Sequence, residues 1–281
     1  MKNKKTGVFR RKSQDIFLSV ITYGAAIIAM SMLAFLVGYV IIKGVPNLKL
    51  SLFSLQYTSD NVSVVPAIIT TVEMTLLSLI IAVPLGVFTA IYLVEYASRK
   101  NKLVGIIRIT AETLSGIPSI VYGLFGMLFF VTALGWGFSL IAGAFTLSIM
   151  ILPLIMRTTE EALKSVPDSF REGSFGLGAG RLRTVFRIVL PSAVPGILSG
   201  IILAIGRIVG ETAALIYTAG TVAQTPSNLT DSARTLSVHM YALSSEGLHT
   251  GEAYATALIL LVMVIGINAF ASYAAKKLAK V

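Results

Sequence analysis

Long apolar runs separated by short polar segments dominate the chain. A helix needs about 20 mostly apolar residues to cross a bilayer. Six runs reach or approach that length, at roughly 16–42, 67–95, 116–134, 138–156, 192–218 and 254–275. The pattern predicts an all-α membrane protein with six transmembrane helices. The first run is much longer than the apolar core of a signal peptide, about 7–15 residues, so we interpret it as an uncleaved anchor.

The polar segments divide the chain into five parts. They are a basic tail (1–15), the first transmembrane helix (16–42), an external linker (43–65), a core (66–275) that includes a cytoplasmic loop (157–187), and a short tail (276–281). A second long external segment, 219–253, is rich in Thr, Ser and Asn. Within it, LTDSARTLSVHMYAL is expected to form a short amphipathic helix across the outer mouth of the protein.

The charged residues support this topology. Only 13% of residues are charged and 55% are hydrophobic, whereas a typical soluble domain has about 25% charged residues. The net charge is +10, and most Lys and Arg residues lie in the two tails and in the loops after the second and fourth apolar runs. By the positive-inside rule these segments, and therefore both termini, are cytoplasmic. Membrane topology thus accounts for the positive charge, and binding to nucleic acid is disfavoured.

Metal and disulfide chemistry find little support. The chain has no cysteine, which excludes disulfides and thiolate metal sites. His239 and His249 are the only histidines, and their separation of ten positions matches no recognised zinc motif. We expect no metal site and no cofactor bound by this chain.

The cytoplasmic loop 157–187 carries signals of two short helices. Thr158 and Glu161 have the spacing of a capping box, which predicts the start of a first helix. Pro167 is expected to end it. Asp168 or Ser169 is expected to cap a second helix.

Two glycines, Gly176 and Gly178, are expected to stop this second helix. The loop also holds more apolar residues than a solvated loop needs, among them Phe170 and Phe175. An ordered knob with an exposed aromatic residue predicts a docking surface for a cytoplasmic partner. Packing of the loop against its own transmembrane helices is the alternative.

Two charges stand out in the apolar run AIGRIVGETAAL at 204–215. Arg207 and Glu211 are four residues apart, so on one helix they share a face. A charge at bilayer depth costs at least about 2.5–3.5 kcal/mol and normally marks a cavity or an ion pair. The pair therefore lines a pathway or fixes helix packing, and the two interpretations are compatible. The small-residue pairs Gly196–Gly200 and Gly206–Gly210 predict that this helix lines a subunit interface.

Two other glutamates have weaker claims to a role. Glu73 lies near the external end of its span, where it lines an outer vestibule or hydrogen bonds to Thr70 or Thr71. Glu112 is expected to pair with Arg108, four residues earlier, in a structural role.

The loop resembles the EAA loop of ABC importer permeases. That motif is Glu-Ala-Ala, three residues, Gly, nine residues, Ile, one residue and Leu-Pro. Here Glu172-Gly173-Ser174 is followed, at the same spacing, by Gly178, Ile188 and Leu190-Pro191, with small residues in place of both alanines. Three further stretches, AVPLGVFTAIYLVEYAS (82–98), SGIPSIVYGLFG (115–126) and GRIVGETAALIYTAG (206–220), are similar to the A-type permease subunits of phosphate-specific importers. The resemblance covers about 66–275.

This resemblance implies a type I ABC importer permease fold in a prokaryotic plasma membrane, working by alternating access. It implies four kinds of partner: a second, non-identical permease subunit of the C type, a dimer of ATP-binding subunits, an extracytoplasmic phosphate-binding protein and the lipid bilayer. ATP and Mg belong to the ATP-binding partner. Gly173 and Gly178 have P-loop spacing, but Ala179-Gly180 follows in place of Lys-Ser/Thr. We therefore expect no ATP hydrolysis by this chain and no enzyme activity.

The resemblance also assigns roles to residues. Glu161, Phe170, Glu172 and Gly178 would belong to the loop that docks the ATP-binding subunit. In the pathway, Arg207 would offer a guanidinium fork to phosphate. Glu211 would hold that arginine between transits, and Glu73 would line the outer part of the path.

Three alternatives remain at this stage. In the first, the chain is an importer permease whose substrate is another oxyanion, such as sulfate, molybdate or tungstate. Alternatively, the chain is an ion-coupled secondary transporter, a class that usually shows internal repeats, and none is visible here. An intramembrane enzyme would need a catalytic cluster such as HExxH, which the sequence lacks.

Overall fold

The computed structural model describes residues 3–98 and 101–278, with side chains for residues 15, 17–98 and 101–277. Within these residues the protein is helical and has no β-strand. Five helices are long and apolar enough to cross a membrane, and a sixth span results if one sharply bent pair is counted as one. The predicted all-α membrane fold is confirmed. The basic side chains of the N-terminal tail, together with Arg99, Lys100 and Lys280, lie outside the described residues.

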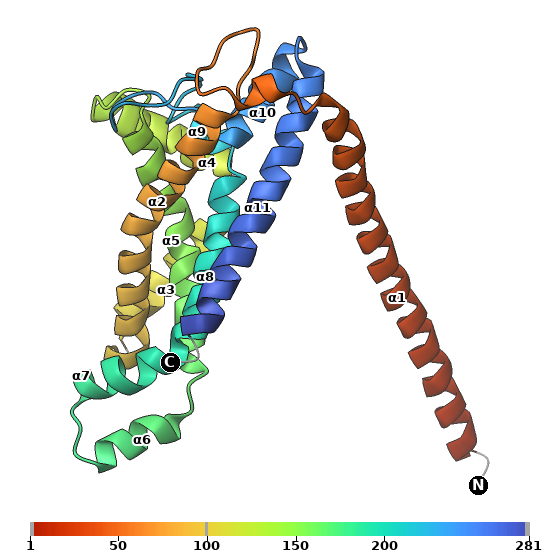
Figure 1. Cartoon of the computed structure of the whole chain (residues 1–281). Helices are drawn as coiled ribbons and strands as arrows, with labels where there is room; N and C mark the ends of the chain where they lie inside the picture. Colours follow the sequence, from red (N-terminus) through yellow and green to blue (C-terminus); the bar gives the residue numbers. More distant parts are fainter. Residues whose placement is uncertain (1–2, 99–100, 279–281) are drawn as a thin grey trace.

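The first helix, α1 (Asn3–Gly44), stands apart from the others over most of its length (Figure 1). It begins well before the predicted start at 16 and contacts α11 (Thr250–Leu278) near its C-terminal end, where the rings of Tyr39 and Tyr254 pack edge to face at 5.8 Å. The apolar window of this span is 0% buried within the chain. Because such a face is unusual in water, α1 is left for lipid or for another subunit to cover.

The core is built on α2 (Val65–Ile91) and α5 (Leu140–Lys164). Small hydroxyl residues let these helices approach closely. The Ser78 hydroxyl lies 3.3 Å from the Ala144 carbonyl oxygen, and the Ser148 hydroxyl donates to the Ser78 carbonyl oxygen at 3.1 Å. Around them the largest buried side chains gather, including Met74, Leu147, Met150, Ile151, Ile155 and Leu215. A π-helical segment, η3 (Tyr92–Tyr96), extends α2.

The third predicted span is shorter than expected. α4 (Ser119–Gly126) continues as the π-helical segment η4 (Met127–Ala133), and α3 (Lys102–Ser115) precedes it at an angle of 103°. The sequence prediction was wrong in treating 99–115 as a loop. Gly116 and Pro118 separate the two helices, and proline restricts the residue before it to non-helical backbone.

The fifth predicted span, 192–218, is also interrupted. α8 (Leu190–Val209) ends at Gly210, and a single turn, α9 (Ala213–Ile216), follows. At its other end α8 continues a helix formed by α7 (Arg181–Thr184) and η5 (Val185–Val189). The expected single helix through both Arg207 and Glu211 is therefore absent.

The loop 157–187 differs from the prediction at its start. The Thr158 hydroxyl donates to the Leu154 carbonyl oxygen inside a continuous α5, so the predicted capping box is wrong. The second helix is present as α6 (Asp168–Gly176), but it begins after Pro167 with no side-chain cap. Its predicted stop is confirmed, since Gly178 has φ +82°, a conformation that favours glycine.

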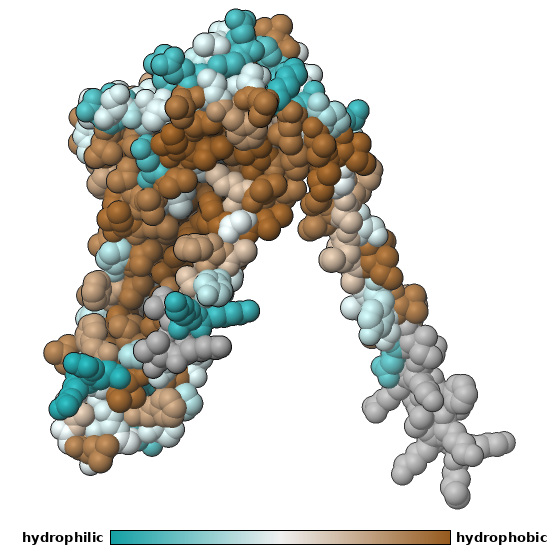
Figure 2. Space-filling model, viewed as in Figure 1, coloured by the Kyte–Doolittle hydropathy of each residue, from teal (hydrophilic) through white to brown (hydrophobic). Residues whose placement is uncertain are grey.

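The external elements are two 3₁₀ turns, η1 (Val45–Asn47) and η2 (Leu50–Phe53), and α10 (Leu236–Glu246). The predicted external helix thus starts later than expected. Its residues Leu236, Val238, His239 and Leu243 are buried, whereas Tyr241 and Ser244 are exposed. A hydrophobic band covers the middle of the molecule, and hydrophilic residues gather at the α10 end (Figure 2). The start of α1, the end of α11 and α6 all lie at the opposite end (Figure 1).

Candidate functional site

Arg207 lies two residues before the end of α8 and is half-buried. Among the described residues it has no hydrogen-bond or ion-pair partner. Its apolar neighbours on α8, Ala204 and Ile208, are buried in the main core. An unpaired guanidinium at this depth is costly unless an external anion or another subunit compensates it.

The expected ion pair between Arg207 and Glu211 is not formed. Because α8 ends at Val209, the four-residue spacing no longer places the two side chains on one helical face. Glu211 is 8% exposed, and its Oε1 accepts a hydrogen bond from the Ala214 N–H at 3.0 Å. Its carbonyl oxygen accepts from the Ser237 hydroxyl at 2.5 Å. Glu211 thus secures the turn into α9 and the contact with α10.

The two helix interruptions lie close to one another. A Cβ at Gly123 of α4 would lie 2.8 Å from the Cα of Ala214 in α9, so only glycine permits this approach. The Tyr122 hydroxyl donates to the Leu114 carbonyl oxygen at 2.8 Å, which fixes the bend between α3 and α4. In membrane transporters, interrupted helices at membrane depth commonly surround the substrate site. Arg207 sits at the end of one of these helices.

The two glycine pairs of α8 have different surroundings. A Cβ at Gly196 would lie 2.6 Å from the Cβ of Ala162, and Gly200 is in still closer contact with Thr158, so this pair packs against α5. Gly206 has nothing within 4 Å, which leaves the second pair open. The face that carries Gly206 is therefore available to a neighbouring helix from another chain.

Glu73 is half-buried, and its Oε2 is a buried oxygen without a hydrogen-bond partner. The alternative bonds to Thr70 or Thr71 are not formed. The Thr71 hydroxyl instead donates to the Ala67 carbonyl oxygen and accepts from the Leu236 N–H. Glu73 lines a groove of about 540 Å³ together with residues of the external segment, including Asn228. The structure does not bring Glu73 and Arg207 together in an interaction.

The residues predicted to dock an ATP-binding subunit lie on α6 and at the nearby end of α5. α6 has no buried residue, and Phe170 is 49% exposed, so this helix presents apolar side chains outward instead of packing them inside. Glu172 is exposed. Glu161 lies on α5 and makes an exposed ion pair with Arg157, 3.1 Å from Nε to Oε1. Of the two interpretations of this loop, the exposed apolar face of α6 favours the docking surface.

Sequence reasoning missed the strongest contact in this loop. Arg171 of α6 reaches Glu95 in η3, with Nη2 2.7 Å from Oε1 and Nε 3.2 Å from the same oxygen. Arg171 also donates to the carbonyl oxygens of Val166 and Leu163, at 2.8 and 2.9 Å. The hydrogen bond that Arg171 donates to the Glu95 carboxylate raises the pKa of Arg171 above its ordinary value. The sequence signal that could have indicated this contact was Glu95 itself, a glutamate near the end of an apolar span.

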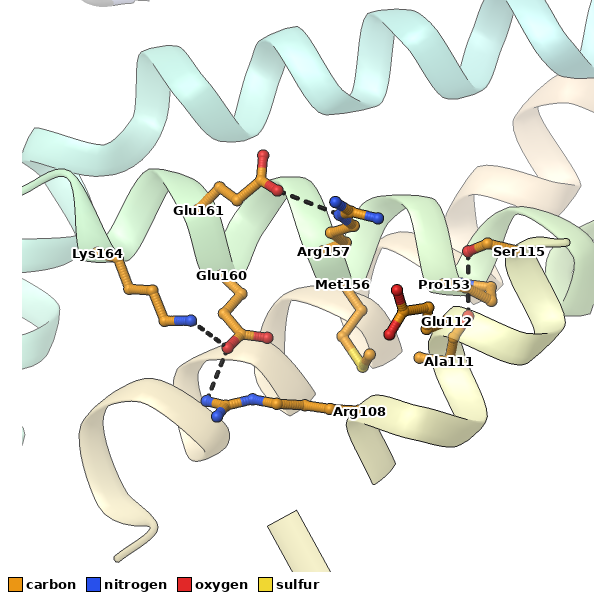
Figure 3. A pocket seen from close by; sticks show the side chains of 10 residues that line it. All are labelled: Arg108, Ala111, Glu112, Ser115, Pro153, Met156, Arg157, Glu160, Glu161 and Lys164. Carbon is orange, nitrogen blue, oxygen red and sulfur yellow. Dashed lines mark hydrogen bonds and ion pairs between the residues drawn. The ribbon is translucent and has the colours of Figure 1, made fainter. Parts of the chain in front are cut away.

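A second ion-pair cluster joins α3 to α5 around a pocket of about 210 Å³ (Figure 3). Oε1 of Glu160 accepts from Arg108 Nη2 at 2.7 Å and from Lys164 Nζ at 2.6 Å. The expected pair between Arg108 and Glu112 is therefore wrong. Glu112 lines the same pocket, but Arg108 pairs with Glu160 of α5 instead.

This arrangement of helices is that of type I ABC importer permeases. One solved structure with a similar fold is the bacterial alginate ABC transporter in complex with an alginate pentasaccharide-bound periplasmic protein. The similarity has a TM-score of 0.70 at 17% identity, covering 95% of this chain and 96% of that chain. The described residues thus have the fold of this class of membrane proteins.

The family follows from sequence comparison. Residues 82–280 match the family "Binding-protein-dependent transport system inner membrane component", and the chain belongs to this family. It is 38% identical over 244 residues to a probable ABC transporter permease protein, YqgI, of Bacillus subtilis, covering 80% of this chain and 81% of that one. It is 37% identical over 231 residues to the phosphate transport system permease protein PstA 2 of Mycobacterium bovis, covering 82% and 76%. The protein is therefore an inner-membrane permease with several spans.

Proposed function

We propose that this chain is the A-type permease subunit of an ATP-driven importer of inorganic phosphate. The observation that carries the proposal is Arg207, a half-buried cation at membrane depth with no partner among the described residues. The similarity to a phosphate transport permease over most of the chain supports the choice of substrate. A guanidinium presents a planar fork of donors that suits the oxygens of phosphate.

The path is proposed to run past Arg207, where the interrupted helices α4 and α9 meet. Phosphate would pair with the Arg207 guanidinium during transit and leave it unpaired afterwards. Release of phosphate would therefore not depend on Arg207 forming an ion pair within this chain. Glu211 acts here by shaping the turn after α8, since its carboxylate is already bonded to the Ala214 N–H. Glu73 is proposed to line the outer part of the path, at the groove shared with the external segment.

The partners are assigned by the surfaces that this chain leaves uncovered. α6, with Phe170, Glu172 and Gly178, is proposed to dock an ATP-binding subunit, which holds ATP and Mg. The exposed α1 and the open face at Gly206 are proposed to pack against a second, non-identical permease subunit. The polar surface at the α10 end would receive an extracytoplasmic phosphate-binding protein (Figure 2). Both termini are then cytoplasmic, on the α6 side.

The mechanism we propose is alternating access. Closure of the ATP-binding subunits would move α6, and the bends at Gly116–Pro118 and Gly210 would allow the ends of α4 and α8 to reorient around Arg207. Neither step requires covalent chemistry in this chain.

The test uses the complete importer in proteoliposomes with its binding protein and ATP. Uptake of labelled phosphate, sulfate and molybdate is compared for the native chain, Arg207→Gln and the control Lys276→Gln. We expect uptake of phosphate only, and a fall of about 30- to 100-fold in Arg207→Gln, the scale of losing a bidentate charged contact. Uptake of another oxyanion instead of phosphate would refute the substrate. Unchanged phosphate uptake by Arg207→Gln would remove Arg207 from the path.

A further inference from the structure

The helix formed by α7 and η5 has one buried face and one unusual exposed face. Thr184, Val185 and Val189 are buried, and the two valines pack in a core shared with the inner ends of α2 and α5. The opposite face alternates apolar and basic residues. It consists of Leu182, Arg183, Phe186, Arg187 and Ile188, which together line a shallow groove of about 820 Å³.

The exposure of this face is large and its charge is of one sign. Leu182 is 66% exposed and Phe186 40%. Arg183 and Arg187, one helical turn apart, have no ion pair or hydrogen bond with the described part of the chain. By contrast, the neighbouring Arg181 lies over the ring of Tyr96 at 5.5 Å, so it is already engaged. The two free guanidinium groups thus flank exposed apolar side chains, with no carboxylate lining the groove.

The position of the face matches the boundary of the hydrocarbon layer. α7, η5 and α8 form one candidate span, Arg181–Val209. Within this span the apolar stretch begins at Ile188, so Arg183 and Arg187 stand at its charged end. α7 runs beside the base of the bundle, whereas α6 projects beyond it (Figure 1). The arginines are therefore at headgroup depth, and Phe186 and Ile188, on the side toward α8, lie nearest the acyl chains.

We infer that this face is a binding site for an anionic phospholipid headgroup of the leaflet at the α6 end. Arg183 and Arg187 hold the headgroup phosphate, and Phe186 and Ile188 contact its acyl chains. Basic residues at the membrane boundary bind anionic lipids in this way. Arg183, Arg187 and Ile188 also line a groove with Phe170 and Ser174 of α6, so a headgroup bound here lies beside that helix. The inference does not depend on the transported substrate.

The test measures lipid binding to the complete, purified importer by native mass spectrometry, with phosphatidylglycerol and phosphatidylcholine added in turn. Arg183→Gln/Arg187→Gln is the test variant, and Lys276→Gln/Lys277→Gln is the matched control, because it removes the same charge at the same end of the molecule. Arg183→Lys/Arg187→Lys reports on folding with the charge kept. We expect phosphatidylglycerol binding to weaken about 30-fold in the test variant, and little in the control.

Three outcomes would overturn the inference. If phosphatidylglycerol binding weakened equally in both double Gln variants, the lipid would be attracted only by the overall positive charge of this end of the molecule. Competition by millimolar inorganic phosphate, without any effect of the acyl chains, would indicate a free-phosphate site. Unchanged lipid binding together with loss of the ATP-binding subunit from Arg183→Gln/Arg187→Gln would assign the face to that subunit.

Discussion

Arg171 of α6 and Glu95 at the end of α2 form a bidentate ion pair, with Nη2 2.7 Å and Nε 3.2 Å from Oε1. The side chains are 15% and 8% exposed, and 76 residues separate them along the chain. Because Arg171 also binds two carbonyl oxygens at the end of α5, it joins three elements into one unit. Movement of α6 therefore carries the inner ends of α2 and α5 with it.

Breaking this pair should both destabilise the loop and uncouple the importer. Removing one partner of a buried pair leaves the other charge without compensation, at a cost of about 3–5 kcal/mol. We expect Glu95→Gln to lower thermal stability and to raise the ratio of ATP hydrolysed to substrate transported. Arg157→Gln, which breaks only the exposed pair with Glu161, should change stability by about 0.5 kcal/mol or less. Equal behaviour of the two variants would contradict the proposed link.

The pocket in Figure 3 gives two glutamates different importance. Glu160 neutralises both Arg108 and Lys164, whereas Glu112 has no ion pair with a described residue. Glu160→Gln is expected to cost about 1–2 kcal/mol, since both cations are partly exposed and lose only part of their stabilisation. Glu112→Gln should be nearly neutral. Thermal unfolding of the two variants in one lipid mixture distinguishes them, and a larger loss for Glu112→Gln would refute this assignment.

Substitutions of two glycines in α8 should have different effects, one on folding of the chain and the other on assembly with a second subunit. A side chain at Gly200 would collide with Thr158 of α5, so Gly200→Val is expected to destabilise the chain by about 1–3 kcal/mol. The measurement is the amount of folded chain extracted in mild detergent.

Gly206→Val meets open space within the chain, so the folded amount should be retained. If the proposed second permease subunit packs on this face, copurification of that subunit should fall. Retained copurification at the native level would place the subunit contact elsewhere.

His239 should make the external region sensitive to acid. It is fully buried, its Nε2–H donates to the Val62 carbonyl oxygen at 3.2 Å, and its Nδ1 accepts from Arg234, which has only donors. Burial, and then the charge of Arg234, lower the pKa of His239 to about 4. The unfolded chain, with an ordinary pKa near 6.5, binds the proton first as pH falls. The contribution of His239 to stability is therefore constant above about pH 6.5 and is lost between pH 6.5 and 4, by about 3 kcal/mol in total.

Thermal unfolding at pH 7.5, 5.5 and 4.5 checks this expectation. His239→Gln should remove most of the decline, because glutamine does not titrate. His249→Gln, which removes the other histidine, should leave the decline in place. An acid response that persists unchanged in His239→Gln would contradict the assignment.

The sequence by itself determined the membrane fold and the position of α6 between Pro167 and Gly178. It also determined the number of spans, except for whether the bent pair α3 and α4 counts as one. These depend on local properties, because crossing hydrocarbon requires apolar length and ending a helix requires residues such as Pro167 and Gly178. It also singled out Arg207, since a charge in an apolar run is visible without coordinates.

Only the tertiary structure decided how the charges are partnered. The spacing of Arg207 and Glu211 predicted an ion pair, but α8 ends at Val209, between the two residues. The Glu211 carboxylate instead accepts a hydrogen bond from the Ala214 N–H of α9. Arg171 and Glu95 lie far apart in sequence, and their contact exists because α6 folds back on the end of α2. Helical periodicity places neighbours within one helix, whereas contacts between helices follow from bends and packing that no local pattern encodes.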